Sequence, residues 1–144
     1  MNEVVKQIEK STNYNFPFSE FKLERKGYGY YCISGNYLSN AVNNYKNKQE
    51  PIKVLKWFDD FWIYIEIHFV QINNEYKILK KDKKDEYIKF LKQQYIKFED
   101  DFYQASVTVS IFQGEESDEI KTQLFRAEWD NYGDNHLHTQ PHWH

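Results

Sequence analysis

The stretch FWIYIEIHFVQI, residues 61–72, decides the fold of this chain. Large apolar side chains alternate along it with a more polar set, and a period of two is typical of a β-strand. The apolar set is Ile63, Ile65, Ile67 and Phe69, and the alternate set is Trp62, Tyr64, Glu66 and His68. We therefore expect the apolar set to face a hydrophobic core.

The residues after this strand predict a hairpin and then a helix. Asn73 and Asn74 suit a tight turn because asparagine tolerates a positive φ, and residues 75–79 are expected to form the antiparallel return strand. Between Asp85 and Phe98 the apolar period becomes helical, with lysines on the opposite face. We expect this helix to cover the sheet.

A second hairpin is predicted nearer the C-terminus. Apolar residues alternate with serine and threonine over residues 105–111, and the polar turn 114–118 follows. A return strand is expected over about 120–129. The alternation again indicates one buried face and one polar face.

The N-terminal third predicts three more elements. Residues 4–8 carry apolar side chains at helical spacing, which indicates a short amphipathic helix. Residues 21–33 are rich in tyrosine and phenylalanine and predict a strand with a turn. Residues 37–46 are expected to form a polar helix.

Long strand-rich segments separated by one helix favour an α+β fold. We expect an antiparallel β-sheet with two or three helices packed mainly on one face, and a doubly wound parallel sheet is disfavoured. No linker or repeat divides the chain. We therefore expect a single domain over residues 1–144 that ends in a histidine-rich arm from about 130 to 144.

The composition limits the classes of function. The chain has 144 residues, 40% hydrophobic and 19% aromatic, and this is enough to build a packed core. Its net charge of -3 excludes a broad positive field, so any contact with nucleic acid must be local. With neither a secretory signal nor an apolar span, the chain is expected to be cytoplasmic and not membrane-bound.

Most of the histidines lie in the C-terminal arm. Four of the five are His136, His138, His142 and His144. Each HxH pair points to one side if its backbone is extended, and Pro141 can bend the chain between the pairs. Imidazole binds divalent metals when neutral and exchanges protons near pH 7. We therefore expect these four histidines to hold a divalent metal, zinc or manganese, although a solvated arm that binds metal adventitiously is the alternative.

Other polar residues could contribute to this metal site or form a functional site elsewhere. Asp130 is expected to orient an imidazole from just before the arm. His68 lies on a strand among core residues and is interpreted as structural, and Cys32 has no evident partner. As the single cysteine, Cys32 excludes an intramolecular disulfide and indicates a reducing compartment. The lysines of residues 77–84 form the basic run of the chain, interpreted as a solvated turn or as a contact for a nucleic-acid backbone.

Two short motifs resemble known families. HLHTQ, residues 136–140, matches the HxHxQ string of nucleotidyltransferases in the histidine-triad superfamily. FRAEWDN, residues 125–131, followed by a histidine pair and by PHWH at 141–144, resembles the C-terminal signature of small prokaryotic toxins of the TumE type. That second resemblance implies a toxin–antitoxin or related defence setting.

Together these features predict a metal- or histidine-dependent nuclease or phosphodiesterase of a bacterial toxin–antitoxin or antiphage defence system. His136, His138 and His142, with Asp130, are the expected catalytic residues. A metal would polarise phosphate, or one histidine would deprotonate an RNA 2′-hydroxyl while another protonates the leaving oxygen. The expected partners are an antitoxin or defence-complex protein and an RNA or DNA substrate. The alternative is a non-catalytic interaction subunit that binds its partner through aromatic side chains, including Trp143.

Overall fold

The computed structural model describes residues 1–12, 16, 20–39, 52–72, 75–118, 120–130 and 142–143. Two α-helices, one short 3-10 helix and nine strands lie within these ranges. They are α1 (Asn2–Thr12), β1 (Phe21–Gly27), β2 (Tyr30–Gly35), β3 (Tyr37–Ser39), β4 (Ile52–Lys56), β5 (Phe61–Gln71), η1 (Glu75–Ile78), α2 (Lys81–Gln94), β6 (Ile96–Phe98), β7 (Asp101–Gln113), β8 (Thr122–Asp130) and β9 (His142–Trp143).

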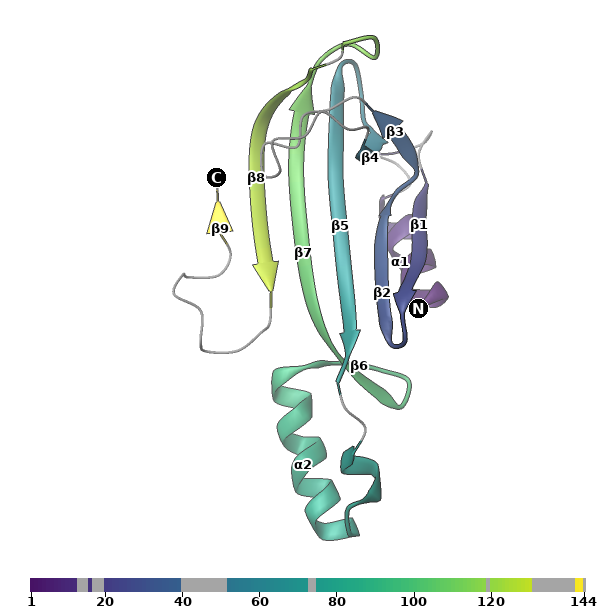
Figure 1. The fold of residues 1–144 in the computed structure, drawn as a ribbon, viewed down its shortest axis with the longest axis vertical. Coiled ribbons are helices and arrows are strands. Elements are labelled where there is room, and N and C mark those ends of the chain that lie inside the picture. Colours follow the sequence, from purple (N-terminus) through teal and green to yellow (C-terminus); the bar gives the residue numbers. More distant parts are fainter. Residues whose placement is uncertain are drawn as a thin grey trace.

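The strands form one antiparallel sheet in the order β1-β2-β5-β7-β8-β9, with β3, β4 and β6 paired off this path (Figure 1). β5 pairs with β7 from Phe61 opposite Gln113 to Gln71 opposite Tyr103, so the strand predicted from its alternation runs along the middle of the sheet. The predicted hairpin of β7 and β8 is also confirmed. The α+β class with an antiparallel sheet is therefore confirmed.

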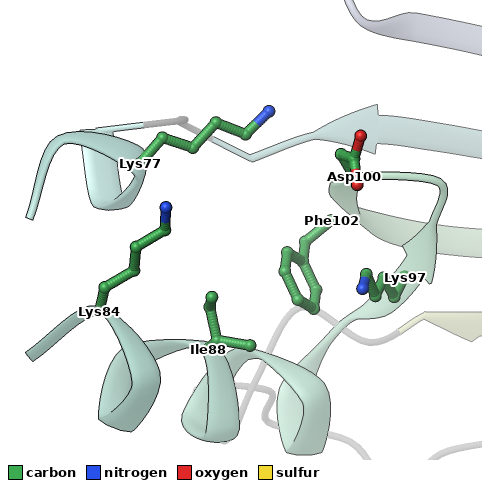
Figure 2. A pocket seen from close by; sticks show the side chains of 6 residues that line it. All are labelled: Lys77, Lys84, Ile88, Lys97, Asp100 and Phe102. Carbon is green, nitrogen blue, oxygen red and sulfur yellow. The ribbon is translucent and has the colours of Figure 1, made fainter. Parts of the chain in front are cut away.

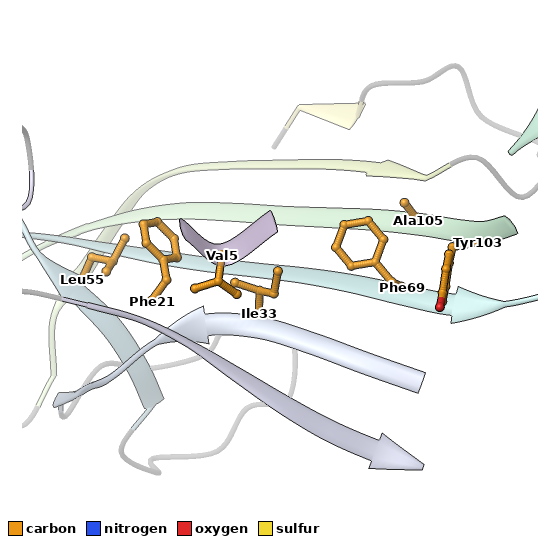
Figure 3. Close-up of a cluster of buried hydrophobic side chains, with 7 residues drawn as sticks. All are labelled: Val5, Phe21, Ile33, Leu55, Phe69, Tyr103 and Ala105. Carbon is orange, nitrogen blue, oxygen red and sulfur yellow. The ribbon is translucent and has the colours of Figure 1, made fainter. Parts of the chain in front are cut away.

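One face of the sheet carries the largest hydrophobic cluster, which the alternation of β5 predicts (Figure 3). Ile63, Ile65 and Ile67 pack against it from β5, and Val5 joins it from α1. Its buried members are Val5, Phe21, Ile33, Leu55, Phe69, Tyr103 and Ala105. The predicted N-terminal helix is thus confirmed, and it covers part of this face.

The opposite face is apolar at one end. Trp62, Val54 and Phe112 form a buried cluster there. The Trp62 indole donates a hydrogen bond to the Gly114 carbonyl (2.8 Å), and the Lys121 ammonium lies 5.2 Å from the Trp62 ring centroid. Burial lowers the pKa of Lys121.

Helix α2 lies beyond the other end of the sheet (Figure 1). Its buried Leu91 packs with Phe102 of β7, and Ile72 and Ile88 pack against this pair. The expectation that the helices pack mainly on one face is not confirmed, because α2 docks on strand ends. The helix spans Lys81–Gln94 and not 85–98, since Ile96–Phe98 pairs with β7 instead.

Two further expectations differ from the structure. Residues 75–79 contain η1 and not a return strand, because β7 takes the long edge of β5 that this strand would have used. Residues 21–33 contain two strands joined at Tyr28 and Gly29. Gly29 has a φ of 64°, and a Cβ there would lie 2.7 Å from Gln71 Cβ, so the turn requires glycine.

The polar helix expected over residues 37–46 is not observed in its described part, where Tyr37–Ser39 forms β3. Pairing of Tyr37 with Val54 explains this, because the segment gains a strand partner in β4. Residues 40–46 lie outside the described ranges. Within the described ranges, neither helix combines the length and the apolar character that a membrane span requires.

The Glu24 carboxylate lies on the edge strand β1, and its contribution to stability can be tested by varying the pH. It accepts hydrogen bonds from Lys26 and Lys53, and these bonds lower its pKa to about 2. A lowered pKa stabilises the fold above the unfolded value near 4.5, and this contribution disappears as pH falls toward 2. We expect Glu24→Gln to lower the urea midpoint at pH 7 and to leave it nearly unchanged at pH 2. An equal loss at both pH values would contradict this assignment.

Candidate metal centre on the sheet

The middle of the second sheet face is polar. Tyr64, Glu66 and His68 follow Trp62 at a period of two on β5, so they share its face. The register of β2 places Cys32 opposite His68, and that of β7 places Thr108 opposite Glu66. The polar residues Glu66 and His68 therefore lie between the buried cluster around Trp62 and the buried cluster around Leu91.

Cys32, Glu66 and His68 form a compact group of three different ligand atoms. Glu66 Oε1 lies 3.0 Å from His68 Nε2 and 3.5 Å from Cys32 Sγ, and the sulfur lies 4.0 Å from the same imidazole nitrogen. The thiol is buried, whereas the side chains of His68 and Glu66 are 22% and 30% exposed. This group could hold a metal ion.

The edges of this triangle can be compared with those of a zinc site. Tetrahedral zinc, with Zn–S near 2.3 Å and Zn–N or Zn–O near 2.0–2.1 Å, separates nitrogen from oxygen by about 3.3 Å and sulfur from either by about 3.5 Å. Each observed distance lies within about 0.5 Å of these values. Small side-chain movements would therefore suffice, and Glu66 and His68 are both partly exposed to solvent.

Two phenols on the same sheet face form hydrogen bonds with His68 and Glu66. In the neutral imidazole, His68 Nε2 donates to Glu66, and the Tyr30 hydroxyl donates to His68 Nδ1 (2.8 Å). The Tyr64 hydroxyl donates to the second oxygen of Glu66. If Nε2 bound a metal, the ring proton would move to Nδ1 and Tyr30 would become the acceptor. This is the outer-shell contact that orients metal-bound histidines.

The charges of the group also suit a cation. The hydrogen bond from His68 lowers the pKa of Glu66 to about 2, so this carboxylate is ionised across the physiological range. Burial raises the pKa of the Cys32 thiol to about 12, and the Glu66 charge adds to this effect. The thiol is therefore protonated at neutral pH, and metal binding would displace its proton.

The residues predicted from the C-terminal arm are only partly described. Asp130 is the last residue of β8 and pairs with Ser106, and His142 of β9 pairs with Glu128. His136, His138 and His144 lie outside the described residues. The structure therefore leaves the proposed histidine convergence untested.

The strand register gives the distance between Glu66 of the sheet group and His142 of the arm. One row crosses five strands through Ser34, Glu66, Thr108, Glu128 and His142. Three strand spacings of about 4.8 Å separate Glu66 from His142, which is about 14 Å in total. The backbone of His142 therefore lies well outside the Cys32–Glu66–His68 group.

The sequence interpretation missed this sheet group. The pattern of core residues around His68 predicts a structural role, and Cys32 has no evident partner in the sequence, although the alternation of β5 places Glu66 and His68 on one face. Two potential metal ligands at positions i and i+2 of one strand were the feature of the sequence that could have indicated this site. Cys32 could not be added from sequence, because 34 residues separate it from Glu66.

The fold and the group together define an antiparallel α+β protein whose sheet carries a Cys–Glu–His set able to bind a metal. A scan against protein-family models, a search of curated proteins and a search of solved structures each found no match to this chain. Functional assignment therefore depends on the chemistry of the residues themselves.

Proposed function

We propose that this chain is a zinc-dependent phosphodiesterase of the nuclease type, with Cys32, Glu66 and His68 as the metal ligands. The observation that carries the proposal is their triangle of sulfur, oxygen and nitrogen atoms, at 3.0, 3.5 and 4.0 Å, on a partly exposed sheet face. Three protein ligands with an open fourth position characterise catalytic zinc sites. A thiolate ligand favours zinc over manganese.

Residues around the group suit a phosphodiester substrate. Zinc would supply Lewis acidity toward a phosphoryl oxygen and lower the pKa of water. Tyr30 and Tyr64 would hold His68 and Glu66 in their ligating orientations. Ser106 and Thr108 lie opposite His68 and Glu66 on β7, and their hydroxyls would donate hydrogen bonds to a phosphate bound there.

The biological setting is proposed from the resemblance of the C-terminal segment to TumE-type toxins. It supports a cytoplasmic role in a bacterial toxin–antitoxin or antiphage defence system, with an antitoxin or defence-complex protein as partner. The arm histidines and Asp130 are proposed as a separate group, which would exchange protons only with a substrate bound at the arm itself. An antitoxin-like gene beside this one would support the setting.

A second candidate function is a non-catalytic interaction subunit. The observation that favours it is the exposure of Leu124 (51%) and Trp129 (37%) on β8, near one edge of the sheet. Exposed aromatic residues commonly anchor protein interfaces. This candidate is preferred if the purified protein neither binds zinc nor cleaves phosphodiesters.

The test compares His68→Ala with His142→Ala in the untagged chain of 144 residues. After EDTA treatment and zinc reloading, we expect His68→Ala to lower zinc-dependent hydrolysis of bis(4-nitrophenyl) phosphate by more than about 100-fold, since even an outer-shell loss costs about 10- to 100-fold. His142→Ala, a histidine outside the sheet group, should retain stoichiometric zinc. Metal content is measured together with hydrolysis.

Circular dichroism and urea unfolding show whether each variant is folded. The reverse pattern, in which His142→Ala loses zinc and His68→Ala retains it, assigns the metal to the arm and rejects the sheet site. Wild-type protein that takes up no zinc also rejects it.

A further inference from the structure

A pocket lies where η1, α2 and the turn between β6 and β7 meet. Its volume is about 410 Å³, within the size range of small-ligand sites. Figure 2 shows Lys77 and Lys84 on one side and Lys97 and Asp100 on the other, with Ile88 and Phe102 between them. The lining thus combines cationic groups with an apolar floor.

The charge of the lining favours an anion. Three ammonium groups and one carboxylate give it a formal charge of +2, that is, three minus one. The Lys77 ammonium lies 2.7 Å from a carboxylate oxygen of Asp101. Within the described residues, no ion pair joins Lys84 or Lys97 to a carboxylate, so both can contact a bound anion.

Two exposed aromatic rings lie on α2, the helix that contributes Lys84 and Ile88 to the pocket. Tyr87 and Phe90 are stacked, with ring centroids 6.0 Å apart and planes inclined by 26°, and they are 42% and 49% exposed. Tyr87 lies three residues after Lys84, so the two are neighbours on the helix surface. Lysines beside exposed aromatic rings are the combination that binds single-stranded nucleic acid through phosphates and stacked bases.

The pocket lies beyond the end of β5 that carries His68 (Figure 1). Ile72 continues β5 four residues after His68, and its amide donates to the Phe102 carbonyl (2.9 Å), so the β5–β7 ladder extends to the pocket floor. Four residues of strand span about 13 Å. A chain of a few nucleotides can therefore occupy the pocket while another of its phosphates reaches the Cys32 group.

We propose that this pocket binds the phosphates of a single-stranded nucleic acid, with Tyr87 and Phe90 stacking on its bases. The inference rests on the proposed function for one point, that the bound strand is the substrate. Lys84 and Lys97 contact phosphate, and the aromatic pair supplies affinity that does not depend on charge. A duplex, whose bases are already stacked, does not bind in this way.

The test measures fluorescence anisotropy of a labelled single-stranded RNA of about twelve nucleotides, with a DNA of the same sequence and a matched duplex. All titrations contain EDTA. We expect Lys84→Gln/Lys97→Gln to weaken RNA binding about 10- to 30-fold at 0.1 M salt. The slope of the logarithm of the binding constant against the logarithm of the salt concentration should fall by about 1.4, because each of the two lost phosphate contacts contributes about 0.7. Tyr87→Ala/Phe90→Ala should weaken binding and leave the slope unchanged.

The matched control is Lys89→Gln/Lys92→Gln, which removes the same charge from exposed lysines of α2 outside the pocket lining. It should retain wild-type affinity. Equal losses in both lysine pairs, equal binding of the duplex, or no binding of either single strand overturns the inference. Preference between RNA and DNA identifies the sugar of the strand that this site accepts.

His68→Ala separates this inference from the proposed function. It should bind RNA like the wild type in EDTA, because the pocket contains no metal ligand. If the wild type neither binds zinc nor hydrolyses phosphodiesters, but binds RNA in a way that the pocket variants weaken, only the proposed function is rejected. If zinc-dependent hydrolysis holds while the pocket variants bind RNA normally, only the pocket assignment falls.

Discussion

Replacing Cys32 with serine is expected to raise the dissociation constant for zinc by more than about 100-fold, because loss of an outer-shell partner alone costs about 10- to 100-fold. Serine preserves the size of the side chain and its hydrogen bond toward Glu66 but does not supply a thiolate. The fold should therefore persist while the metal site is lost. Isothermal titration with zinc measures the dissociation constant.

Cobalt substitution adds a spectroscopic test of the same ligand. Co²⁺ bound to the wild-type protein should show a thiolate-to-metal charge-transfer absorption, which Cys32→Ser abolishes. Since Cys32 is the single cysteine of the chain, no other residue can produce this band.

The matched control for Cys32→Ser is Ser34→Ala, two residues along β2 and on the same sheet face, opposite Glu66. It should leave both zinc affinity and the cobalt spectrum unchanged. A metal-loaded protein with no thiolate band would show that the ligands lie elsewhere.

Replacing Gly35 with alanine is expected to lower the free energy of unfolding by about 3 kcal/mol, at the upper end of the usual effect of overpacking. Gly35 is buried at the end of β2, where β4 crosses closely. A Cβ at this position would overlap the Val54 carbonyl group and lie 2.9 Å from the Leu55 nitrogen. These are backbone atoms, so relief requires β2 and β4 to separate.

The same substitution at Gly27 provides the control, because a Cβ there meets no atom within 4 Å. Urea unfolding should show a large loss for Gly35→Ala and little change for Gly27→Ala. Equal effects of the two substitutions would contradict the close approach of β4 to β2.

Several elements followed from local sequence alone. The alternation over residues 61–72 predicted β5 and its buried face, and the pattern over residues 105–129 predicted the hairpin of β7 and β8. Side chains on a strand alternate between two faces, so a periodic sequence identifies both the element and its core-facing residues. The amphipathic N-terminal helix was predictable for the equivalent helical reason.

The errors arose where tertiary pairing competed with local preference. Residues 75–79 were expected to pair with β5, but β7 pairs along its whole length and leaves that segment as η1. Residues 37–39 became a strand because β4 offered a partner. The local preference of a segment does not reveal which distant strand will pair with it. The pairing of these segments therefore could not be predicted from their own residues.

The sequence by itself determined that Glu66 and His68 share the face of β5 opposite the main core, because residues two apart on a strand point the same way. Only the tertiary structure decided that Cys32 joins them. That contact depends on β2 pairing with β5 in the register that sets Cys32 opposite His68. A register shift of one residue would turn the thiol to the other face of the sheet, so the candidate metal centre is a property of strand pairing.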